Sequence, residues 1–259
     1  MNSSFTTSRG ICYQVIGLGT PLIMLHGISD SKEDWFDYGY VDGLKESHQL
    51  VLIDFRGRGE SIKKYDSESY TLDILADDIQ SVIDQLEITE FDILGYSMGG
   101  VIAHWFSKRY PSKIRSMVSL DGLVIADLVG YYNWWSENIE AMLEDYAADP
   151  RHSDTKKNKI INEDKKSLQA LSQGLSQSIS RNLAEFLTLL EPVYPYLVLS
   201  SNWDDADLDV TDYIKWAMAE TTFKKYPDFD HADFAYKSDI VLSDLDAFYE
   251  RIEKQGGIK

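Results

Sequence analysis

Short apolar runs recur along this chain, and segments with helical periodicity separate them. The runs at 21–27 and 49–57 each hold a continuous apolar stretch and end at glycine, a pattern that predicts buried strands. In contrast, 70–86 places apolar residues three and four positions apart, as an amphipathic helix does. Together these patterns predict strands over 21–27, 49–57, 91–95, 114–122, 195–200 and 221–226, and helices over 70–86, 99–110, 209–219 and 238–255. Such alternation predicts an α/β fold with a mostly parallel central sheet and right-handed crossovers.

The alternation stops between 123 and 192. Strand-like runs are replaced there by helical stretches over 138–148, 160–173 and 178–190. We therefore expect a helical cap at 123–192, inserted into a core formed by 1–122 and 193–259. The polar segment 149–159 predicts an exposed loop within the cap rather than a binding patch.

Charge and cysteine content exclude several kinds of protein. The 259 residues hold 25 Lys and Arg against 43 Asp and Glu, a net charge of −18, which disfavours binding to nucleic acid or to an anionic membrane surface. With Cys12 as the single cysteine, a disulfide within the chain is impossible and a zinc site of the C-x-x-C type is excluded. The chain shows no signal peptide and no apolar span of membrane length, so we expect a cytoplasmic protein. The oligomeric state stays open.

The sequence Gly95-Tyr96-Ser97-Met98-Gly99 is a G-x-S-x-G pentapeptide. A predicted strand stands directly before it and a predicted helix directly after it, so the serine falls on a sharp strand-to-helix turn. Such a turn holds the hydroxyl above the sheet at a helix N-terminus, where developing negative charge is favoured. We therefore expect Ser97 to be a catalytic nucleophile.

A serine nucleophile needs a base, and His231 is the best placed of the five histidines. It follows the last predicted strand, and loops at the carboxyl ends of parallel strands share one edge of the sheet. The base in turn needs a carboxylate on its other nitrogen. We expect Asp204, which follows the strand at 195–200. Asp205 is the second choice, and the remaining candidates are Asp207, Asp209 and Asp121.

These motifs resemble those of the α/β-hydrolase superfamily, in particular its small cap-bearing esterases, enol-lactonases and perhydrolases. The similar segments are Leu25-His26-Gly27-Ile28, the turn from Asp54 to Ser61, and the pentapeptide with Gly100. The resemblance implies that the backbone N–H groups of Ile28 and Met98 form an oxyanion hole. Ser201-Asn202-Trp203-Asp204 matches the family's G-x-x-D segment, except that serine replaces glycine, and Asp230 stands where the family often has glycine.

Serine at this position predicts acyl transfer, since relatives that act on epoxides or haloalkanes use a carboxylate nucleophile. We expect a serine hydrolase that cleaves a small carboxylic ester, lactone or thioester, and that needs no metal or organic cofactor. Aromatic residues at the start of the cap, Tyr131, Trp134 and Trp135, are candidates for the substrate pocket, although they would equally serve to dock the cap. The alternatives are a C–C bond hydrolase, a perhydrolase, or a ligand-sensing protein with little turnover.

Overall fold

A single mixed sheet organises the chain, with strand order β1-β2-β4-β3-β5-β6-β7-β8. The computed structural model describes residues 3–122, 127–183, 185, 194–201 and 221–254. Within these, the strands are β1 (Ser4–Thr6), β2 (Cys12–Ile16), β3 (Thr20–Leu25), β4 (His48–Ile53), β5 (Phe91–Tyr96), β6 (Ile114–Leu120), β7 (Tyr196–Ser200) and β8 (Thr221–Lys225). The pairs β1–β2 and β2–β4 are antiparallel, and all other neighbours are parallel.

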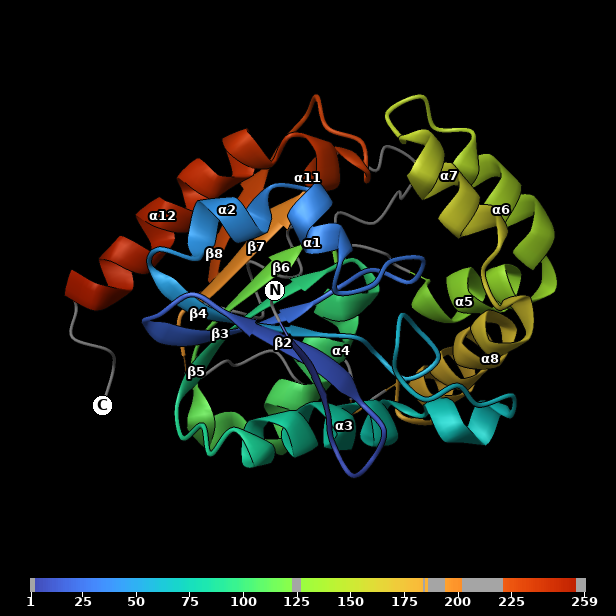
Figure 1. Ribbon diagram of the computed structural model, residues 1–259, viewed down its shortest axis with the longest axis horizontal. Helices are drawn as coiled ribbons and strands as arrows, with labels where there is room; N and C mark the ends of the chain where they lie inside the picture. The colour runs from blue at the N-terminus through green and yellow to red at the C-terminus, as the bar shows by residue number, and fades with distance from the viewer. Residues whose placement is uncertain (1–2, 123–126, 184, 186–193, 202–220, 255–259) are drawn as a thin grey trace.

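Helices cover both faces of this sheet. In the described residues they are α1 (Asp34–Asp37), α2 (Tyr40–Leu44), α3 (Leu72–Gln85), α4 (Met98–Arg109), α5 (Leu128–Glu137), α6 (Ile139–Ala147), α7 (Asp154–Ile161), α8 (Lys165–Arg181), α11 (Asp233–Tyr236) and α12 (Ser238–Lys254), with short 3₁₀ turns at Ser67–Tyr70 and Pro111–Lys113. Figure 1 shows α3 and α4 on one face, α2 and α12 on the other, and α5 to α8 gathered at one side. No helix of the described residues is long and apolar enough to span a membrane.

The alternation of side chains along the central strands explains the two layers. On β4, Leu50 and Leu52 pack into the cluster with α2 and α12, whereas Val51 and Ile53 pack into the cluster with α3 and α4. Since successive strand residues point to opposite faces, a continuous apolar run serves both layers. This confirms the predicted α/β class and all six predicted strands. β1 and β2 were not predicted.

Between β6 and β7, the described residues 127–183 are mostly helical, as expected, and we call α5 to α8 the cap helices. Their apolar side chains belong to the same hydrophobic cluster as α3 and α4. The expected cap boundaries at 123 and 192 and the predicted helix at 209–219 lie outside the described residues.

Two predictions within the cap were wrong. Two separate helices were predicted on either side of 174–177, but the structure has one helix, α8, through this segment. Gly174 does not interrupt α8; it lets the helix approach the Ser67 carbonyl oxygen, which would lie 2.5 Å from a Cβ at this position. The segment 149–159, predicted to be an exposed loop, contains most of α7 and buries Lys156. In addition, α5 was not predicted as a helix.

Candidate active site

Ser97 lies at the junction of β5 and α4 in a strained backbone conformation, with φ 52° and ψ −118°. The glycines on either side make this sharp turn possible. A Cβ at Gly95 would lie 2.6 Å from backbone atoms of α4, and a Cβ at Gly99 would lie 2.0 Å from the Leu25 carbonyl oxygen. The strand, turn and helix therefore pack backbone against backbone, which presents the Ser97 side chain at the carboxyl edge of the sheet.

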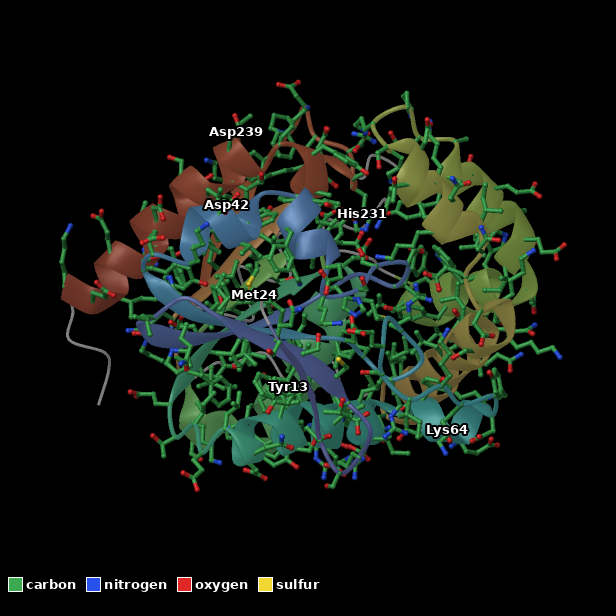
Figure 2. The ribbon with its side chains drawn as sticks, in the orientation of Figure 1. Tyr13, Met24, Asp42, Lys64, His231 and Asp239 are labelled. Atoms are coloured by element: carbon green, nitrogen blue, oxygen red, sulfur yellow. The ribbon has the colours of Figure 1, made fainter. Side chains whose placement is uncertain are left out.

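His231 reaches Ser97 from the loop after β8, 134 residues later in the chain. The distance from its Nε2 to Ser97 Oγ is 2.9 Å, and Figure 2 shows His231 on the side of the core that faces the cap helices. Tyr96 packs against the His231 imidazole. The two rings stack with centroids 5.2 Å apart, and the Tyr96 hydroxyl donates to the His231 carbonyl oxygen at 3.1 Å. The predicted pair of serine and histidine is thus brought together. Nothing in the sequence pointed to Tyr96 as its support.

The carboxylate beside His231 belongs to Asp121, at the end of β6. Its Oδ2 lies 2.6 Å from His231 Nδ1, and its side chain is fully buried. Asp204, our expected acid, and the other three candidates after β7 lie outside the described residues. Asp121 was the remaining candidate. Its position at the end of the strand next to the one that carries Ser97 was the signal that could have ranked it first among the acids.

Ser201 holds Asp121 in position. Its backbone N–H donates to Asp121 Oδ1 at 2.9 Å, and its hydroxyl donates to Oδ2 at 2.8 Å. Asp121 itself has φ 53°, and its N–H donates to the Leu199 carbonyl oxygen at 2.8 Å. The Ser201 hydroxyl therefore supplies Asp121 with a hydrogen bond that a glycine at position 201 would lack.

The expected oxyanion donors lie at the same edge. Ile28 follows β3, in a turn closed by a hydrogen bond from the Asp30 N–H to the Gly27 carbonyl oxygen at 3.2 Å. Met98 is the first residue of α4, so its N–H has no partner within the helix. The dipole of α4 also favours negative charge at this end.

His26 fixes the start of the turn that carries Ile28. Its Nε2 accepts from the Phe55 N–H at 3.2 Å, so its Nδ1–H donates to the Gly27 carbonyl oxygen at 2.7 Å. Burial lowers the pKa of His26, in agreement with this neutral form. Since both ring nitrogens are engaged with backbone, His26 has a structural place and is not a second base.

The three aromatic pocket candidates occupy different positions on α5. Tyr131 is partly buried against the hydrophobic cluster, and burial raises its pKa. Trp135 is 4% exposed and packs in the hydrophobic cluster, while Trp134 is 52% exposed. Tyr131 and Trp135 thus pack with the hydrophobic cluster, as docking of the cap requires, and the pocket assignment stays a prediction.

One group of side chains has the composition of a metal site. Ligand atoms of Cys12, Asp54 and Glu60 lie within 4.8 Å of one another. However, the Lys32 ammonium already contacts both carboxylates, at 2.9 Å from Asp54 and 2.5 Å from Glu60. A cation of the protein itself thus compensates these charges, and we assign no metal to this group.

A family model described as alpha/beta hydrolase fold matches residues 20–160, which is more than half of the chain. The chain belongs to this α/β-hydrolase family. The matched range contains the turn of Ile28, the turn of Ser97 and Asp121, and it ends before the loop of His231.

Curated relatives and solved structures agree with this assignment. The chain is 35% identical over 103 residues to a serine hydrolase-like protein of Danio rerio, covering 40% of this chain and 31% of that one. It is 30% identical over 141 residues to 2-hydroxymuconate semialdehyde hydrolase of Pseudomonas sp., covering 51% and 50%. The chain thus spans half or less of these relatives. A thermophilic esterase of Thermogutta terrifontis shares the fold, with a TM-score of 0.76, 17% identity and coverage of 97% and 99%.

Proposed function

We propose that this protein is a serine hydrolase that cleaves a small carboxylic ester, lactone or thioester through an acyl-enzyme on Ser97. The observation that carries the proposal is the continuous chain from Ser97 Oγ to His231 Nε2 at 2.9 Å and from His231 Nδ1 to Asp121 at 2.6 Å. A nucleophile, a base within hydrogen-bond reach and a group that orients the base are what acyl transfer requires.

In the proposed reaction, Ser97 Oγ attacks the carbonyl carbon of the substrate while His231 Nε2 accepts the hydroxyl proton. Asp121 holds the imidazole in the tautomer with the proton on Nδ1 and stabilises the imidazolium that forms. The backbone N–H groups of Ile28 and Met98 stabilise the oxyanion, each contributing on the order of 3 kcal/mol. His231 then protonates the leaving group, activates a water molecule, and the acid is released.

The test is the hydrolysis of p-nitrophenyl esters of increasing acyl length by wild type and by Ser97→Ala. We expect turnover that depends on acyl length in the wild type and none above background in the variant. A fluorophosphonate probe should label Ser97 in the wild type only. Equal turnover by the folded variant would contradict the assignment of the nucleophile.

A second candidate is hydrolysis of a C–C bond with the same residues. The 30% identity to a hydrolase named for a muconate semialdehyde, a compound without an ester, favours it. A protein that is labelled at Ser97 but turns over no ester in the series would support this candidate. Binding of a small ligand without product release would instead support a sensing role on the same fold.

A further inference from the structure

The cap segment 149–161 carries cations that reach two separate loops of the core. The segment comprises the turn after α6 and the helix α7. Lys156 and Lys159 contact the loop after β3, and Arg151 contacts the loop after β8. These two loops hold the proposed oxyanion donor Ile28 and the proposed base His231.

At the first loop, Lys156 inserts its ammonium between two buried carboxylates. Its Nζ lies 2.8 Å from Asp30 Oδ1 and also contacts Asp34, while Lys159 Nζ lies 2.7 Å from Ser31 Oγ and 2.5 Å from Asp34. Asp30, Asp34 and Lys156 are all more than nine-tenths buried. Water is therefore largely excluded, and the cap lysines supply the charge that these carboxylates need.

The Asp30 carboxylate is part of the oxyanion turn. Its N–H closes the turn on the Gly27 carbonyl oxygen at 3.2 Å, and its Oδ2 lies where a Cβ on Gly27 would come within 2.7 Å. The Tyr38 hydroxyl donates to Oδ1 at 2.7 Å, on the same oxygen as Lys156. Burial alone would raise the pKa of Asp30, but Lys156 outweighs it and holds the pKa far below its usual range. Lys156 of the cap therefore holds the Asp30 carboxylate, which belongs to the same turn as Ile28.

At the second loop, Arg151 binds Asp230 and Asp233, which stand on either side of His231 in the chain. Its Nη1 lies 3.0 Å from Asp230 Oδ1 and 2.8 Å from Asp233 Oδ1, and its guanidinium packs on the Tyr236 ring at 5.3 Å. Asp230 and Asp233 also accept from each other's backbone N–H groups, at 3.0 and 2.9 Å. Arg151 therefore closes a rigid turn around the histidine.

We propose, building on the function proposed above, that segment 149–161 is a positioning element of the catalytic site. Lys156 positions the oxyanion turn through Asp30, and Arg151 positions the His231 loop through Asp230 and Asp233. The two loops lie far apart in the sequence, and the cap segment connects them through the ion pairs of Lys156 and Arg151. Its docking aligns the oxyanion donor and the base with Ser97.

The expected kinetic signature follows from this geometry. Loss of the Lys156 charge leaves Asp30 buried without a cation, so the carboxylate moves toward water or takes up a proton, and the Ile28 N–H moves with it. A displacement of about 1 Å at a reacting centre costs on the order of 100-fold in rate. Because this N–H acts on the developing oxyanion rather than on the bound substrate, the loss should appear in kcat and not in KM.

The experiment compares Lys156→Met with Lys157→Met, the matched change one residue along the same helix. The backbone N–H of Lys157 donates to the Ser153 carbonyl oxygen at 2.9 Å, but among the described residues its ammonium group forms no hydrogen bond or ion pair. For the preferred p-nitrophenyl ester we expect kcat to fall roughly 10- to 100-fold in Lys156→Met, with KM within about threefold, and no change in Lys157→Met. Arg151→Met should lower kcat by a smaller factor, because the Arg151 side chain is itself 31% exposed and water screens its interactions.

A double variant separates positioning from stability. Asp30→Asn with Lys156→Met removes the uncompensated charge, so resistance to urea should return toward the wild-type value while kcat stays low. Recovery of kcat together with stability would overturn the proposal, as would equal kcat in Lys156→Met and Lys157→Met.

Amide hydrogen exchange tests the same contact without any turnover. In Lys156→Met we expect faster exchange over 27–34 than in Lys157→Met, and equal rates would overturn the proposal. The wild type could fail to hydrolyse esters and to be labelled at Ser97 while exchange over 27–34 is still faster in Lys156→Met than in Lys157→Met. In that case the proposed function fails, but the coupling between the cap and the turn stands.

Discussion

Replacing Asp121 with asparagine tests the most specific feature of the site, the placement of the acid at the end of β6. In the structure Asp121 Oδ2 accepts from both His231 and the Ser201 hydroxyl, while Oδ1 accepts from the Ser201 backbone N–H. An asparagine satisfies only one side. If its oxygen faces the backbone N–H, its amide group donates to His231 Nδ1 and forces the proton onto Nε2, where it blocks acceptance of the Ser97 proton. If its oxygen faces His231, the amide group opposes the Ser201 N–H.

Either arrangement removes the orienting carboxylate, for which losses of about 10⁴ in kcat are known from serine proteases. We expect kcat/KM for a p-nitrophenyl ester to fall about 10³- to 10⁴-fold, equivalent to about 4 to 5.5 kcal/mol of transition-state stabilisation. The assay is steady-state hydrolysis beside Asp204→Asn as a matched carboxylate-to-amide change, which should stay within a few fold of wild type. A loss of less than tenfold in Asp121→Asn, or a large loss in Asp204→Asn, would refute the assignment.

Three further predictions concern Ser201, Gly99 and the buried histidines. Ser201→Ala removes the hydroxyl but keeps the backbone donor to Asp121, so kcat/KM should fall about tenfold; unchanged kinetics would show that the hydroxyl is dispensable. Gly99→Ala forces a Cβ to within 2.0 Å of the Leu25 carbonyl oxygen, so the free energy of unfolding in urea should drop by about 3 kcal/mol or more, and a drop below 1 kcal/mol would argue against this close packing. Burial lowers the pKa of His26, His48 and His152, so below about pH 6.5 these side chains take up protons when the protein unfolds. The stability that is present above about pH 6.5 should therefore be lost as the pH falls. Equal urea midpoints at pH 7.5 and pH 5.5 would contradict this prediction.

The strands and core helices were predictable because their signals are local. Continuous apolar runs such as Leu50 to Ile53 fill both faces of a covered sheet, and the 3.6-residue spacing of α3 matches its buried face. Ser97 was predictable for the same reason, since strand, pentapeptide and helix are contiguous. β1 and β2 were not predicted, because the three residues of the edge strand β1 are exposed and Gln14 interrupts the apolar residues of β2, so no continuous apolar run marks either strand.

The helix and the buried lysine of cap segment 149–161 were not predicted for a different reason. A lysine-rich stretch predicts solvent exposure unless partners are known, and the partners of Lys156 lie 122 and 126 residues earlier in the chain. Only the tertiary structure brings those carboxylates to the helix and converts an apparently exposed lysine into a buried cation.

The sequence by itself determined the α/β class, the nucleophile turn and the histidine that reaches it, because each depends on residues close together in the chain or on the rule that parallel strands share one carboxyl edge. The choice among acids depended on more. Several aspartates follow strands at that edge, and which carboxylate meets His231 is a matter of a few ångströms, set by the adjacency of β6 and β5 and by the two donors of Ser201. Distances of that size come from packing between elements, and no local pattern encodes them.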